Sequence, residues 1–216
     1  LYREVIKTPN NQFMEQALIT ASSILFGMED YQEAFDYYQR LEKISESTEN
    51  KLIAMRGMLR SSYQEGDAQK SIDAANKITS STNMPEELVR GAIFIRAKAR
   101  YSLNEFDEAL VDFRKTGTEI TSIEGAESKY RVAEILFMKG STDESEKIVT
   151  RFIDQNSPHQ YWMAKTFLLL ADISIKKGDS LQARATLQSL NEYYSVKDDG
   201  ILDEVKTKLA SLDEPK

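Results

Sequence analysis

The chain has 216 residues, of which 41% are hydrophobic and 29% charged, and its net charge at pH 7 is -7. This balance predicts one or two folded domains and excludes a disordered acidic tail. The absence of cysteine excludes disulfides and thiolate metal sites, and His159 is the single histidine available for catalysis. Lysine and arginine are spread without a basic cluster, so no nucleic-acid partner is expected.

The hydrophobic pattern has helical periodicity throughout and no strand-like alternation. Residues 1–9 are expected to be the remnant of a preceding helix, broken at Thr8 and Pro9. In chain order, the predicted helices then span residues 11–27, 30–45, 48–64, 67–80, 85–102, 105–116, 122–139, 142–155, 158–177, 179–194 and 199–211. The longest apolar run, residues 167–171, is far shorter than the roughly 20 residues of a membrane span, so no membrane insertion by this segment is expected.

Small residues recur with a period of 36 to 38 residues. The five members of this series are Ala34, Ser71, Ala109, Ser145 and Ala183. Twelve residues before each stands a second position, occupied by Ser22, Leu59, Ala97, Ala133 and Ala171. Two small residues at these places let two helices approach closely across a tight turn. We therefore predict five helical hairpins within residues 10–197, at about 11–46, 47–82, 83–119, 120–156 and 157–197, followed by a capping helix and polar tail at 198–216.

The turn inside each hairpin has its own residue chemistry. Four hairpins place a residue that tolerates a left-handed backbone at this turn, namely Gly66, Asn104, Gly140 and Gly178. Asp67, Ser141 and Asp179 directly follow the glycines and are predicted to cap the next helix. The first hairpin has Glu29 at this point, so a different turn is expected there.

Taken together, these places resemble the tetratricopeptide repeat (TPR), over residues from about Gln12 to Tyr194. The shared features are a small residue at the eighth place, glycine near the fifteenth, an aromatic at the seventeenth (Tyr31, Phe106) and alanine at the twentieth. An aromatic or aliphatic residue follows at the twenty-fourth. The period departs from the usual length of about 34 residues, and Ser71 and Ser145 replace the alanine. The resemblance implies an all-α, right-handed superhelical solenoid.

A narrower resemblance concerns the long repeat proteins of bacterial cell envelopes, of the type associated with Tol-Pal and outer-membrane assembly. This resemblance rests on short segments such as residues 133–137 and 170–173. The lack of cysteine fits both cytoplasm and periplasm, and the resemblance favours a periplasmic or envelope location. Because the chain starts inside a helix-like run, we expect it to be the C-terminal part of a larger repeat protein.

In TPR proteins, first-helix residues line a concave groove that binds partners. Carried over to this chain, the expected peptide-binding residues are Phe26, Arg56, Arg60, Tyr63, Phe94, Lys98, Tyr101, Tyr130, Glu134, Phe137 and Asp172. The aromatic members form either an exposed band for a peptide or an apolar stripe packed between helices. The charged members make the groove basic at one end and mixed or acidic at the other, which would orient a charged peptide. Alternatively, these charges are merely solvated.

Nothing in the pattern predicts catalysis, a cofactor or a metal site. His159 is expected in an exposed loop, no glycine-rich phosphate-binding motif occurs, and the acidic residues 198–204 lack the spacing of a calcium loop. We therefore expect a non-catalytic scaffold that binds a protein or peptide partner. The alternative is a structural spacer or homo-oligomerisation segment of an envelope assembly. An enzyme in a portion preceding Leu1, with this chain as its regulatory arm, is a third hypothesis that these residues leave open.

Overall fold

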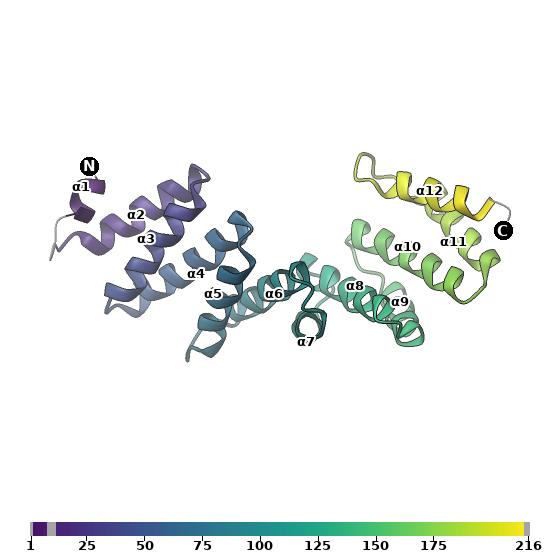
Figure 1. Cartoon of the computed structure of the whole chain (residues 1–216), viewed down its shortest axis with the longest axis horizontal. Helices are drawn as coiled ribbons and strands as arrows, with labels where there is room; N and C mark the ends of the chain where they lie inside the picture. Colours follow the sequence, from purple (N-terminus) through teal and green to yellow (C-terminus); the bar gives the residue numbers. More distant parts are fainter. Residues whose placement is uncertain (1, 8–11, 214–216) are drawn as a thin grey trace. The chain divides into compact units, whose positions relative to one another are not determined.

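A computed structural model describes residues 2–7 and 12–213, and within these residues every regular element is a helix (Figure 1). The helices are α1 (Tyr2–Lys7), α2 (Met14–Gly27), α3 (Tyr31–Ile44), α4 (Thr48–Glu65), α5 (Ala68–Ser80), α6 (Glu86–Ser102), α7 (Phe106–Thr116), α8 (Ile123–Met138), α9 (Thr142–Gln155), α10 (Gln160–Lys176), α11 (Ser180–Tyr193) and α12 (Ile201–Asp213). The predicted all-α class is confirmed. The expected break at Thr8 and Pro9 lies outside the described residues.

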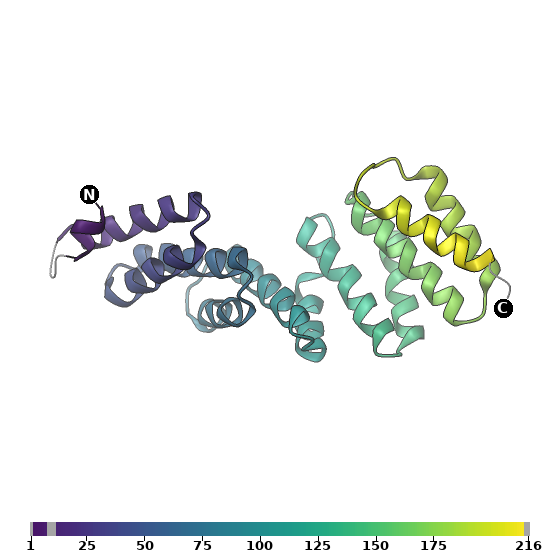
Figure 2. The same cartoon turned by 45° about the horizontal axis from the view of Figure 1, so that its top comes forward.

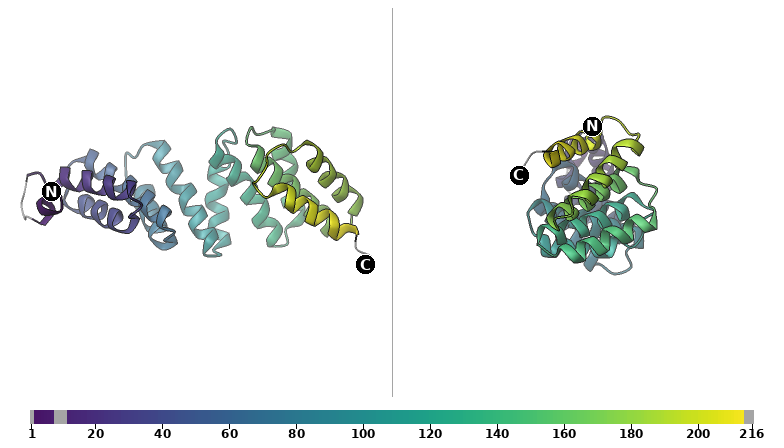
Figure 3. Two further views of the ribbon diagram at one scale, coloured as in Figure 1. Left: turned by 90° about the horizontal axis from the view of Figure 1, so that it is seen from above. Right: turned by 90° about the vertical axis from the view of Figure 1, so that its right-hand side faces the viewer.

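The chain divides into two compact units, which we call the first body (Leu1–Asp112) and the second body (Phe113–Lys216), with the boundary inside α7. Consecutive helices pack in pairs within each body, as Figures 2 and 3 show for α2 to α5 and for α8 to α11. In the second body α12 packs against α11 and α10. Right-handed winding of the whole stack stays a prediction.

The small residues of the repeat stand at helix contacts, as predicted. All nine of them are buried, including the serines Ser22, Ser71 and Ser145, and so is Leu59 at the tenth position. In the fourth hairpin the two series meet directly, because the hydroxyl of Ser145 donates a 2.7 Å hydrogen bond to the carbonyl oxygen of Ala133. Serine therefore replaces alanine here without leaving its buried hydroxyl unpaired.

All five hairpins use the same left-handed turn. The residue at this turn has a positive φ in every case, including the non-glycine residues Glu29 (φ 63°) and Asn104 (φ 61°). The amide of the following residue donates to a carbonyl five residues back, for example Asp30 to Leu25, at 2.9 Å. This is the Schellman closure of a helix C-terminus. The expectation of a different first turn is wrong, because these backbone bonds hold the left-handed conformation even without glycine.

Capping of the second helices is less uniform than predicted. Asp67 and Asp179 each accept a backbone N–H from the residue three positions on, at 2.9 Å. Ser141 makes no such bond, so its predicted capping role is wrong. Its ψ is 57°, whereas Ser47 and Ser122, which do cap, have extended backbones with ψ of 126° and 151°. The short serine side chain reaches the free amides from an extended backbone.

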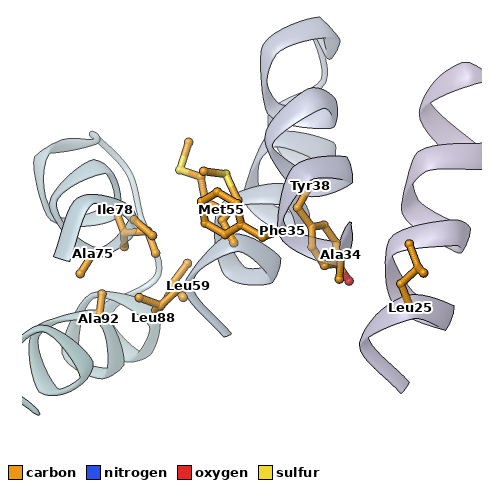
Figure 4. Close-up of a cluster of buried hydrophobic side chains, with 12 residues drawn as sticks. Leu25, Ala34, Phe35, Tyr38, Met55, Leu59, Ala75, Ile78, Leu88 and Ala92 are labelled. Carbon is orange, nitrogen blue, oxygen red and sulfur yellow. The ribbon is translucent and has the colours of Figure 1, made fainter. Parts of the chain in front are cut away.

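The first body has its main core between α2 and α6 (Figure 4). Phe35 and Tyr38 of α3 pack against Met55 and other side chains of α4. The Tyr38 ring lies so close to Gly57 that a Cβ at this position would stand 2.5 Å from ring atoms. Glycine at this place allows the aromatic residue to fill the space between α3 and α4.

The second body has two core clusters. One joins α8, α9 and α10 and includes Tyr130 and Phe152. The other joins α10, α11 and α12 and includes Leu187, Ile201 and Val205. The helix after the fifth hairpin thus buries two side chains of its apolar stripe against the stack.

Candidate protein-binding surface

Seven of the eleven predicted groove residues belong to the first body and come from α2, α4 and α6. We call this set the first-body surface; it comprises Phe26, Arg56, Arg60, Tyr63, Phe94, Lys98 and Tyr101. The four aromatic side chains are half-buried, as is Lys98, while Arg56 and Arg60 are exposed. The rings are therefore partly packed and partly accessible, between the two alternatives that the sequence left open.

Cations and rings alternate across these helices in a repeating arrangement. The guanidinium of Arg60 on α4 lies 4.6 Å from the ring centre of Phe26 on α2. The ammonium of Lys98 on α6 lies 5.5 Å from the ring of Tyr63 on α4 and 5.4 Å from the ring of Phe94. Arg60 and Lys98 occupy the ninth place of the second and third repeats, and Phe26 and Tyr63 occupy the twelfth place of the first and second repeats. A cation at the ninth place of one repeat thus covers the aromatic residue at the twelfth place of the repeat before it. Such cation–π contacts fix the cation on the ring face.

Two rings of the first-body surface, Phe26 and Tyr101, also contact an aromatic side chain of their own hairpin. Phe26 meets Tyr31 edge-on, with ring centres 5.2 Å apart, and Tyr101 meets Phe106 in the same way at 5.4 Å. Both contacts join the end of a first helix to the start of the second. Edge-to-face packing orients Phe26 and Tyr101 against their hairpins while they stay half-exposed.

The two arginines of the first-body surface keep their charges available. In the part of the chain that the structure describes, neither Arg56 nor Arg60 makes an ion pair or a hydrogen bond. The guanidinium of Arg60 makes only the cation–π contact with Phe26. One carboxylate of the same body, Glu15 of α2, is engaged with other side chains. Glu15 accepts hydrogen bonds from Ser45 and Asn50, both at 2.6 Å, and these two bonds lower the pKa of its carboxyl group.

The other four predicted residues belong to the second body and gather at one cavity of about 220 Å³, which we call the second-body cavity. Its lining includes Tyr130, Glu134, Phe137, Asp172, Lys165 and Glu204. Tyr130 is buried, and the other three predicted residues are half-buried. The sequence reasoning missed Glu204, whose side chain reaches this site from α12.

Tyr130 and Glu134 form the polar wall of this cavity. The Tyr130 hydroxyl donates to Glu134 Oε1 at 2.7 Å, and Arg131 donates to Glu134 Oε2 at 2.6 Å. Burial, followed by the nearby Glu134 charge, raises the pKa of Tyr130 far above its usual range, so the hydroxyl stays a donor. The Arg131 guanidinium also lies 5.6 Å from the Tyr130 ring and 5.7 Å from that of Trp162.

Helix α12 neutralises the remaining charges of the second-body cavity. Lys208 pairs with Asp172 at 2.6 Å, and Glu204 pairs with Lys165 at 2.9 Å. On the rim, the Lys176 ammonium lies 4.7 Å from the Phe137 ring centre. The acidic end of the predicted groove therefore consists of paired charges. Sequence periodicity places Asp172 on the inner face but carries no signal for its partner 36 residues away.

A second buried ion-pair group also escaped the sequence reasoning. Asp112 of α7 is 1% exposed and accepts two bonds from Arg96, at 2.7 and 2.8 Å, and one from Arg100 at 2.8 Å. The sequence feature that could have revealed this ion-pair group is an aspartate within the apolar stripe that contains Ala109 and Phe113. A charge at such a place is tolerated when it is paired and hydrogen-bonded. This group ties α6 to α7 within the first body.

The polar groups considered for other chemistry have structural roles. His159 is half-buried rather than exposed, and its ring nitrogen donates to the Thr121 carbonyl oxygen at 2.9 Å. Asp199 accepts the amide of Ile201 at 3.1 Å at the start of α12. Among residues 2–7 and 12–213, no cluster of three or more metal-ligating side chains occurs. Within the same residues, no helix has the length and apolarity needed to cross a bilayer.

Comparison with known proteins finds neither a matching family model nor a matching curated protein. Among solved structures, the chain is similar to a tetratricopeptide repeat protein from Parabacteroides merdae ATCC 43184, with a TM-score of 0.53 and 16% identity over 95% of this chain and 90% of the other. It is also similar to BtubC (BKLC) from P. vanneervenii, with a TM-score of 0.59 and 13% identity over 92% and 82% of the two chains. At these identities the likeness defines the fold, which is a TPR-like helical repeat.

Proposed function

We propose that this chain is a non-catalytic scaffold that binds a peptide or helix of a partner protein on the first-body surface. The observation that carries the proposal is the repeated placement of a cation over an aromatic ring on α2, α4 and α6. Helical-repeat folds present such surfaces for binding, and they are typically without catalytic activity. Half-exposed aromatic side chains beside arginine are the residue types that dominate protein interfaces.

The test is selection of random 16-residue peptides against the purified chain, followed by fluorescence anisotropy of the selected peptides. Replacing Tyr63 and Tyr101 together by alanine removes two ring faces, and we expect binding about 10- to 100-fold weaker with unchanged helicity. Tyr161→Ala is the matched control, because this exposed tyrosine lies on α10 of the second body. Selection of no peptide, or equal binding by the double variant, would contradict the proposal.

A structural spacer or oligomerisation segment is the second candidate, and one observation favours it. A cavity of about 570 Å³ opens on α10 and α11 of the second body, with Phe167, Leu170 and Tyr193 in its lining. A surface of this apolar character can pack against another chain. Sedimentation that found a stable dimer, weakened by Phe167→Ser, would favour this role. The location in a bacterial envelope stays a proposal supported by the sequence resemblance alone.

A further inference from the structure

We infer that the first-body surface takes an acidic, extended segment of a partner protein, whose carboxylates bind Arg56 and Arg60. This inference rests on the proposed function and names the chemistry of the partner. It is carried by two arginines without acidic partners on a surface whose rings already hold one of them in place.

Arg60 is set up to bind a carboxylate through its edge. Stacking on Phe26, at 4.6 Å, occupies one face of the guanidinium plane. The five N–H donors of arginine lie around the edge of that plane, so the stack leaves them pointing outward. No acceptor for them stands among the described residues. A carboxylate matches two of these donors in a forked, charge-assisted pair.

Arg56 supplies a second donor group at a distance that an extended chain can match. It stands one turn before Arg60 on α4, and both side chains are exposed. Side chains four residues apart on a helix begin about 5–6 Å from each other. In an extended peptide, alternate side chains lie on one face about 6.6 Å apart. Two acidic residues separated by one other residue therefore fit the two arginines.

Lys98, the third cation of the first-body surface, adds positive charge near the two arginines. Lys98 reaches from α6 to the ring of Tyr63, which stands three residues after Arg60 on α4. Asp112, the buried carboxylate of this body, is already paired with Arg96 and Arg100. The chain as a whole carries a charge of -7, which disfavours a long polyanion such as a nucleic acid. A short acidic segment meets only the local cations.

The experiment uses three pools of fluorescein-labelled 12-residue peptides. Each pool alternates a mixture of Phe, Tyr and Leu with one fixed residue, which is Glu, Gln or Lys. We expect the Glu pool to bind the full chain at least about 10-fold more tightly than the Gln pool at low salt, with this advantage falling as salt rises. The Lys pool should bind more weakly than the Gln pool.

The variant R56Q with R60Q should lower the affinity for the Glu pool about 10- to 100-fold and leave the Gln pool unchanged. Lys147→Gln with Arg151→Gln is the matched control, since these two exposed cations stand one turn apart on α9 of the second body. This control should bind the Glu pool as the wild type does. Circular dichroism checks that all variants keep their helices.

The possible failures separate this inference from the proposed function. Equal binding of the Glu and Gln pools, or an undiminished Glu pool with R56Q and R60Q, overturns the inference. So does a single-stranded 12-nucleotide DNA that binds as tightly as the Glu pool with the same dependence on the arginines. If neutral peptides bind and are lost with Tyr63→Ala and Tyr101→Ala, the scaffold function stands without acidic specificity. If no pool binds, both proposals fail.

Discussion

The two bodies carry charged residues at the same repeat places but use them differently. In the first body, Arg60 at the ninth place stacks on a ring and keeps its donors available. In the second body, Asp172 at the same place is paired with Lys208 of α12. Glu134, also at the ninth place, is bonded to Tyr130 and Arg131. A charge at a groove position is thus available for a partner only if the chain itself does not supply the counter-charge.

The largest expected effect tests whether the two bodies are separate cooperative units. Phe152 is fully buried in the second body, so Phe152→Ala should lower the free energy of unfolding of that body by about 3–5 kcal/mol. Hydrogen exchange should accelerate in α8 to α10 and stay slow in α3 to α5. Leu41→Ala, in the core of the first body, should give the reverse pattern. Equal acceleration in both bodies by either variant would contradict the division.

A smaller effect compares two carboxylates with different burial. Asp112 is enclosed with Arg96 and Arg100, so Asp112→Asn should lower stability by about 2–3 kcal/mol, because both arginines lose a charged acceptor. Glu134 of the second body has a side chain 19% exposed, so Glu134→Gln should lower stability by about 1 kcal/mol. Urea denaturation measures both. A larger loss for Glu134→Gln would show that burial does not rank these pairs.

The smallest effect concerns the helix caps. Asp67→Ala should lower stability by about 1 kcal/mol, because it removes the acceptor at the start of α5. Ser141→Ala at the matching place before α9 should change stability by less than about 0.5 kcal/mol, since no cap bond is lost. Thermal unfolding of both variants measures the difference. Equal losses would mean that Ser141 caps α9 in solution.

The Asp67 cap should also depend on pH. The backbone N–H of Lys70 is the main cause that holds the pKa of Asp67 below its usual value. A lowered pKa in the folded state means that the contribution is complete above the unfolded pKa of about 3.9 and is lost as pH falls through the folded value. The difference between wild type and Asp67→Ala should therefore shrink below about pH 4. A difference that persists unchanged in acid would exclude the carboxylate as the cap.

Local rules accounted for most of the fold. The twelve-residue spacing of the paired positions, the helical periodicity and the left-handed turns all act within one hairpin. Every helix predicted after residue 10 is present with its ends close to the expected positions. The errors are also local but depend on exact backbone angles. Glu29 takes a left-handed backbone that side chains rarely adopt, and Ser141 has a ψ that keeps its hydroxyl from capping. Residue type alone does not specify either angle.

What the sequence by itself determined is which residues share the inner faces of the repeats, because helical periodicity and repeat register place Arg60, Lys98 and Asp172 at one position of the second, third and fifth hairpins. What only the tertiary structure decided is which of these residues meet a partner. Arg60 finds the Phe26 ring 34 residues earlier, and Asp172 finds Lys208 36 residues later. Such contacts depend on the packing of different helices and on side-chain reach, which no local pattern encodes.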